Sequence, residues 1–176
     1  LPVYFRIHGM SLVDLGLLSL LTLPYALKFL WAPAVDFLGS RRRWIGAAQL
    51  LMGGAILFIV PLDPADPTFL LWTALGALAI LSATQDIAID AYTIEMLKPS
   101  EMGIANGFRQ AAYRVALFVA GGIFVAMGGW IGWGPTYVVA AIILILCSVA
   151  TLWLPRVEVE RPAFHLSTLS APARDL

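Results

Sequence analysis

Apolar residues occur along this chain in runs long enough to cross a lipid bilayer. A helix needs about 20 apolar residues to span the hydrocarbon core. The runs predict five spans, at about residues 11–37, 44–62, 68–97, 102–128 and 135–154. The last two belong to one uncharged stretch, which the turn-forming sequence GGWIGWGP divides. The pattern therefore predicts an all-α polytopic membrane protein.

The segments outside these spans are short. Residues 1–10 are expected to be the external end of a first helix that is mostly missing, followed by a loop. Ser11 followed by Asp14 predicts the start of the first complete span, which Pro24 and Pro33 interrupt. Residues 156–176 are polar and contain proline, which predicts a cytoplasmic loop or linker.

Composition agrees with the membrane class. The chain is 60% hydrophobic and 12% charged, and its mean hydropathy is +0.86. A soluble domain is closer to half apolar and a quarter charged. The formal net charge is zero, so nothing indicates a nucleic-acid partner. The partner expected from composition is the lipid bilayer.

Basic residues alternate between the predicted loops. Arg41–Arg43 lie in one loop, Lys98 in the next loop on the same side, and three further arginines after the last span. The loops on the other side, 61–67 and 128–134, contain no Lys or Arg. Cytoplasmic loops are enriched in Lys and Arg, so the arginine loop is expected to face the cytoplasm.

Acidic residues occur inside the third predicted span, where a charge costs several kcal/mol unless it is paired or wetted. Asp86 lies about 16 Å from the end of the helix at Leu97, and Asp90 about 10 Å, at ~1.5 Å per residue. One narrow helix face carries both acids together with Ser82 and Thr93. Neither aspartate is explained as an end residue.

The fourth predicted span carries a matching polar face within an arc of about 140°. Its members are Asn106, Arg109, Gln110, Tyr113 and Arg114. Antiparallel neighbours place Arg114 at the depth of Asp86 and Arg109 at the depth of Asp90. Lys28, in the first complete span, lies at an intermediate depth and is expected to join either acid.

Two interpretations of these charges remain open. Intramembrane ion pairs can simply hold helices together, but ionisable residues at bilayer depth more often serve solutes or protons. Three cations and two acids also leave a surplus positive charge, which suits an anionic solute. Lys28, Asp86, Asp90, Arg109 and Arg114 are therefore the candidate substrate and proton pathway.

The turn between the first two spans is a second candidate site. It contains an acid, a glycine and three arginines: Asp36, Gly39, Arg41, Arg42 and Arg43. They either only fix topology and the turn, or they pair with helix ends and are released when helices move. No His/Cys cluster, phosphate loop or nucleophile motif is present, so no metal, cofactor or enzymatic activity is expected.

Three segments carry a family resemblance. The turn AVDFLGSRRR resembles the loop signature between the second and third helices of major facilitator transporters. The segments LPYALKFLWAPAVD and SATQDIAIDAYTIEML are similar to motifs of AmpG-type muropeptide permeases and the related acetyl-CoA transporters, and AAYRVALFVAGG resembles a third stretch of that family. Thr93 and Arg109 depart from the family pattern.

The resemblance implies that the five spans are the second to sixth of a twelve-helix protein and lie in its first six-helix half-bundle. The missing C-terminal six-helix half would form the other cavity wall. Family motif positions are occupied by Lys28, Gln85, Asp86, Asp90 and Arg114, so the resemblance adds Gln85 to the candidate pathway. It also implies proton-coupled import by alternating access in a bacterial inner membrane, with Asp36 and Arg41–Arg43 as a cytoplasmic gating motif. A secondary transporter for a polar or anionic solute, such as muropeptide-like fragments, is therefore the favoured function. A membrane-embedded transferase and an inactive or structural fragment are the alternatives.

Overall fold

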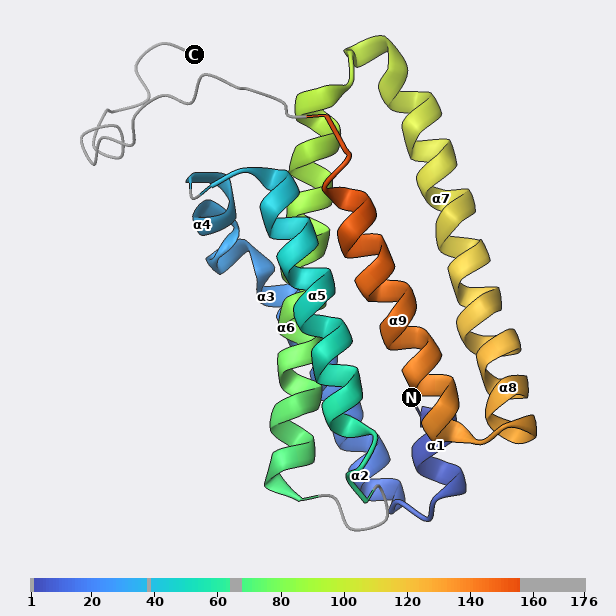
Figure 1. Ribbon diagram of the computed structural model, residues 1–176. Helices are drawn as coiled ribbons and strands as arrows, with labels where there is room; N and C mark the ends of the chain where they lie inside the picture. The colour runs from blue at the N-terminus through green and yellow to red at the C-terminus, as the bar shows by residue number, and fades with distance from the viewer. Residues whose placement is uncertain (1, 38, 64–67, 156–176) are drawn as a thin grey trace.

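The computed structural model describes residues 2–37, 39–63 and 68–155, and the regular structure in these ranges is helical. The side chains of residues 2, 36 and 37 lie outside this description. Long helices packed against one another form the centre of the bundle, and the helix of residues 102–118 stands to one side of them (Figure 1). The all-α membrane class predicted from the sequence is confirmed.

The centre consists of α5 (Arg41–Ile59), α6 (Phe69–Met96) and α9 (Trp133–Thr151). Helix α5 packs against both α6 and α9 (Figure 1). A Cβ atom on Gly53 would lie 3.1 Å from Cγ1 of Ile145 and 3.2 Å from the carbonyl oxygen of Ala141. Small residues let membrane helices approach closely in this way, so Gly53 sets the spacing of α5 and α9.

The first predicted span is not one continuous helix. Ser11 is the N-cap of α2, because its hydroxyl accepts the Asp14 N–H, as the sequence predicts. Pro24 and Pro33 remove backbone donors and favour short helical segments. The chain forms α2 (Leu12–Leu17), η1 (Leu18–Thr22), α3 (Leu23–Leu27), η2 (Lys28–Leu30) and α4 (Ala32–Phe37), of which η1 and η2 are 3₁₀ segments.

The three arginines lie in a helix rather than in a loop, which corrects their predicted place. Gly39 has φ of +73°, a left-handed conformation that glycine adopts without strain. The chain turns there, Ser40 is the N-cap, and α5 begins at Arg41. The arginine side chains therefore leave the first turn of α5 in different directions.

The last two predicted spans form a hairpin. The short segment η3 (Pro99–Glu101) leads into α7 (Met102–Phe118), which continues through a π-helical segment at Val119–Ile123 into α8 (Phe124–Trp130). Gly132, with φ of +90°, makes the turn into α9, within the predicted breaking sequence. No residue of α7 is buried among the described residues.

The predicted count of five spans is not confirmed among the described residues. Four helical stretches are long and apolar enough to cross a membrane: Leu12–Leu30, Phe69–Met96, Pro99–Trp130 and Trp133–Thr151. Helix α5 is not among them, because arginines at its start and Gln49 lower its mean hydropathy. Its 19 residues nevertheless lie parallel to the spans between which it packs (Figure 1).

The first helical segment, α1 (Pro2–Ile7), lies at the end of the bundle opposite the arginines (Figure 1). Phe5 and Met10 are fully buried there, in a cluster with Ile59 of α5 and Leu71 of α6. Residues 156–176, the predicted loop or linker, lie outside the described residues.

Candidate solute and proton site

Four of the predicted residues meet between three different segments. The Lys28 Nζ atom lies 2.5 Å from Asp86 Oδ2 and 3.9 Å from Asp90 Oδ2. Arg109 donates through Nη2 to Asp86 Oδ1, at 3.1 Å, and through Nη1 to Asp90 Oδ1. Each cation therefore contacts both acids. We call these four residues the charge cluster.

The local backbone explains why these side chains meet. Asp86 and Asp90 lie one turn apart on α6, so both project from the same face. Lys28 ends α3 and begins the 3₁₀ segment η2, where the first span is broken. Arg109 reaches across from α7 to α6. A discontinuous helix beside two intact ones is a recurrent design for ion and solute sites in transporters.

The charge cluster is electrically balanced and open. Two cations face two acids, so their formal charges cancel. Within the described part of the chain, the four side chains are between 30% and 52% exposed. The ion pairs are therefore only partly covered by the described residues.

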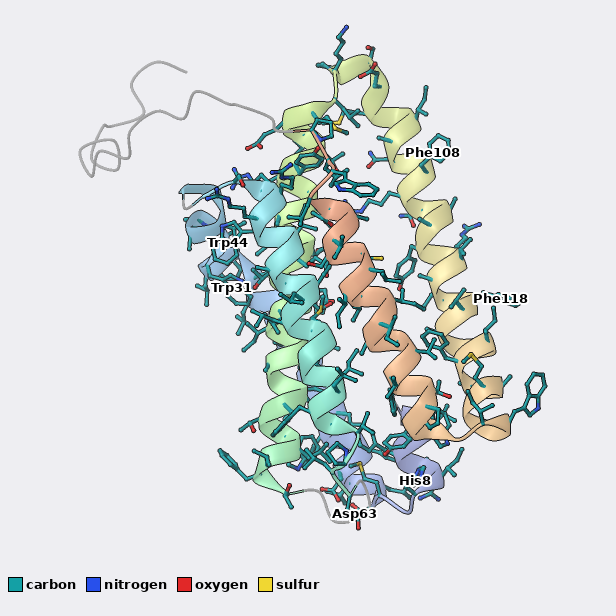
Figure 2. All side chains as sticks on the ribbon, viewed as in Figure 1. His8, Trp31, Trp44, Asp63, Phe108 and Phe118 are labelled. Atoms are coloured by element: carbon teal, nitrogen blue, oxygen red, sulfur yellow. The ribbon has the colours of Figure 1, made fainter. Side chains whose placement is uncertain are left out.

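Arg114 does not occupy its predicted place opposite Asp86. Arg109 contacts both aspartates instead, and Arg114 is exposed and makes no ion pair with any described residue. At ~100° per residue, Arg114 lies about 40° around α7 from Gln110 on one side and about 40° from Phe118 on the other. Figure 2 shows Phe118 pointing away from the bundle. The prediction from depth ignored the length of the Arg109 side chain, which contacts two acids one helical turn apart.

A polar hollow of about 600 Å³ adjoins the charge cluster. Asp86 of α6 forms one wall. The other wall is the polar face of α7, made of Asn106, Arg109, Gln110 and Tyr113. Gln85 lies beside Asp86 on α6, is half-buried, and makes no side-chain hydrogen bond with another described residue. The hollow offers amide, phenol and charged groups to a polar solute.

Two further hydrogen bonds join the broken first span to α6, and neither was predicted from the sequence. The hydroxyl groups of Tyr25 and Ser82 lie 2.5 Å apart, and Trp31 Nε1 donates to Thr84 Oγ1 at 3.1 Å. Tyr25, Lys28 and Trp31 are spaced by three residues, the period of a 3₁₀ helix. That spacing was a signal that the three side chains lie on one side of the segment.

At the end of the bundle where α5 begins, which we call the arginine end, Arg41 is nearly enclosed. Its Nε atom lies 3.0 Å from Glu95 Oε1 of α6, and the two side chains are only 9% and 14% exposed. Its Nη1 also donates to the carbonyl of Val35 in α4. Arg41 thus connects α4, α5 and α6.

Arg42 connects α5 to the end of α9 instead. Its Nη1 donates to the carbonyls of Leu152, at 2.8 Å, and Leu154, at 3.0 Å. The last carbonyls of a helix carry partial negative charge, which favours a cation there. Tyr92 of α6 donates to the carbonyl of Pro155, at 3.0 Å. The side chain of Asp36, also predicted for this motif, lies outside the described residues.

Comparison with known proteins agrees with this architecture. The family model of the Major Facilitator Superfamily matches residues 1–172. The anhydromuropeptide permease of Escherichia coli K12 is 34% identical to the chain, over 99% of the chain and 37% of the permease. A Haemophilus influenzae protein is 31% identical over 92% of the chain and 40% of its own length.

A Rickettsia felis protein assigned by name to the AmpG transporters is 26% identical over 96% of the chain and 43% of its own length. The chain thus spans about two fifths of the length of the curated relatives it matches. The family and the names of the relatives indicate an integral membrane transporter rather than an enzyme. The chain belongs to the Major Facilitator Superfamily, among homologues named as AmpG-type permeases.

Proposed function

We propose that this chain is part of a secondary active transporter that imports a polar or anionic solute together with protons. The observation that carries the proposal is the charge cluster, in which two acids share two cations beside a polar hollow. Ionisable groups at bilayer depth are costly, and proteins retain them chiefly along solute and proton pathways.

The charge balance of the cluster couples proton binding to solute binding. The charge cluster is neutral when both aspartates are ionised, so binding a proton to Asp86 or Asp90 leaves one positive charge in excess. That excess attracts an anionic group of the solute into the hollow. Release of the solute leaves the excess charge unpaired, which favours release of the proton. Proton and anionic group therefore enter and leave together, without a surplus cation in the resting site.

The contacts at the arginine end are the proposed gate. Arg41 and Arg42 connect the ends of α4, α6 and α9 through one ion pair and three hydrogen bonds to carbonyls. Alternating access requires that such contacts form in one state and open in the other. Asp36, Gly39 and Arg43 are assigned to the gate by the family resemblance alone.

The solute class follows from the relatives and the hollow together. The E. coli relative is named as a permease for anhydromuropeptides. Amide and phenol groups in the hollow suit sugar hydroxyls and peptide groups, and the cations suit carboxylates. We therefore infer a muropeptide-like solute and a bacterial inner membrane.

Uptake by the full-length protein tests the proposal. Proteoliposomes carrying an inward proton gradient are supplied with labelled anhydromuropeptide, and the wild type is compared with Asp86→Asn and Asp90→Asn. At least one variant is expected to lose gradient-driven uptake while retaining solute exchange without a gradient. Asp14→Asn, at the start of α2 and outside the charge cluster, is the matched control. Unchanged uptake and unchanged pH dependence in both cluster variants would refute the coupling role.

A further inference from the structure

The three consecutive arginines have different surroundings. Arg41 is buried against Glu95, and Arg42 binds the end of α9. The side chain of Arg43 is exposed and makes no hydrogen bond or ion pair with any described residue. It instead lines a groove of about 390 Å³ together with Gly39, Trp44 and Ala47. Of the three arginines, Arg43 is therefore the exposed one, and it borders a groove.

The same face of α5 continues as an apolar groove. A second hollow, of about 460 Å³, is lined from α5 by Leu50, Leu51, Gly54, Ala55 and Phe58. Small residues of α6 (Thr73, Ala74 and Ala77) form its other side. Arg43, Ala47, Leu50, Gly54 and Phe58 recur at helical spacing within an arc of about 80°, so the two hollows follow one stripe along the helix.

This stripe lies on the outer side of α5. Leu50, Leu51 and Phe58 are 53%, 57% and 48% exposed, whereas Ile45, Met52 and Ile59 on the other faces are buried. A Cβ atom on Gly54 would meet nothing within 4 Å. The stripe therefore combines one cation at the membrane boundary with a shallow apolar channel beneath it.

We propose that this groove binds one anionic phospholipid of the leaflet at the arginine end, with its phosphate on Arg43 and an acyl chain along Ala47, Leu50 and Gly54. An amphiphile fits both halves of the stripe, whereas a soluble anion would leave the apolar half uncovered. Arg43 lies about 16 Å from Gly54 along the helix, which is close to the thickness of one leaflet's hydrocarbon layer.

Electrostatics favours an anionic rather than a zwitterionic headgroup. Cytoplasmic leaflets carry anionic lipids, and a juxtamembrane Lys or Arg contributes about 1 kcal/mol to binding them. The positive-inside pattern places Arg43 on that side. Trp44 next to it is half-buried, at the level where tryptophan rings commonly meet lipid headgroups. Phosphatidylglycerol is the probe that separates headgroup charge from acyl-chain contact.

Lipid binding to the purified full-length protein tests the inference. Native mass spectrometry counts bound phosphatidylglycerol and phosphatidylcholine at equal concentrations. Arg43→Gln is expected to weaken phosphatidylglycerol binding about five-fold, with little change for phosphatidylcholine. Gly54→Leu, which fills the apolar channel, is expected to weaken both lipids.

Two controls separate this site from general charge and bulk. Lys98→Gln removes an exposed cation from another loop on the same expected side, and Gly103→Leu adds the same side chain to α7 in open space. Both controls are expected to bind lipid like the wild type. Equal binding of phosphatidylglycerol to the wild type and Arg43→Gln would overturn the headgroup assignment, and unchanged binding to Gly54→Leu would overturn the channel.

Discussion

Double-mutant cycles test which cations belong to the charge cluster. The perturbations are Asp86→Asn combined with Lys28→Met, and Asp86→Asn combined with Arg114→Met. Asp86→Asn and Lys28→Met each leave the charge cluster with unequal numbers of cations and acids, whereas their double variant keeps the numbers equal. Arg114→Met removes a cation that makes no ion pair with a described residue. The difference between the double variant and the sum of its singles is the coupling energy of the pair.

The structure predicts different couplings for these pairs. Coulomb energy varies as the inverse of distance, and Lys28 Nζ lies 2.5 Å from Asp86 and 3.9 Å from Asp90. In one dielectric, the closer pair interacts about 1.6 times more strongly. The side chains are about one third exposed, so screening brings the Lys28–Asp86 coupling to about 1–2 kcal/mol. The Arg114–Asp86 coupling is expected within ~0.5 kcal/mol of zero.

The assay is the free energy of unfolding of the full-length protein in bicelles, titrated with SDS and followed by helical circular dichroism. Lys28→Met with Asp90→Asn provides an internal comparison, because its coupling should lie between the other two. An Arg114–Asp86 coupling equal to that of Lys28–Asp86 would refute the arrangement in which Arg109, and not Arg114, closes the charge cluster.

Three further predictions concern helix contacts and turns, each measured by the same unfolding assay. Gly53→Ala is expected to lower the free energy of unfolding by about 1–2 kcal/mol, because the new Cβ would press on the Ala141 carbonyl. Gly54→Ala places its Cβ in open space, so it should leave the stability unchanged or raise it. A larger loss of stability in Gly54→Ala than in Gly53→Ala would contradict the close packing of α5 and α9. Glu95→Gln should lower the free energy of unfolding by about 1–3 kcal/mol, because it removes the ion pair with Arg41. A double variant that exchanges Arg41 and Glu95 should not recover this stability, because the Val35 carbonyl loses its Arg41 donor. Full recovery in the double variant would show that only the ion pair contributes. Gly132→Ala should cost about 1–2 kcal/mol, because φ there is +90°, and an unchanged midpoint would argue against this turn.

Hydropathy predicted the last three spans but not the form of the first one. The predicted spans at 68–97, 102–128 and 135–154 correspond to Phe69–Met96, Pro99–Trp130 and Trp133–Thr151, which are long and apolar enough to cross a membrane. The segment around Lys28 breaks into α-helical and 3₁₀ pieces, which depends on packing against α6. A membrane helix tolerates proline in several ways, so the residues alone do not select one.

The charge cluster was also predicted only in part from the sequence. Helix periodicity predicted that Asp86 and Asp90 share a face and that cations face them from neighbouring spans. It could not predict that Arg109 contacts both acids, because side-chain reach and the separation of α6 and α7 are tertiary properties. The connections made by Arg42 to α9 are equally invisible in sequence, since their acceptors are backbone carbonyls that any residue supplies.

The π-helical segment at Val119–Ile123 has a consequence for the polar hollow. A π-bulge corresponds to one extra residue inserted into an α-helix. Removing one residue from it would restore uniform winding and turn everything before it by about 100° relative to the α8–α9 hairpin. Arg109 would then swing out of reach of both aspartates, although no contact residue had been altered. A single-residue deletion there should therefore behave like loss of the arginine itself.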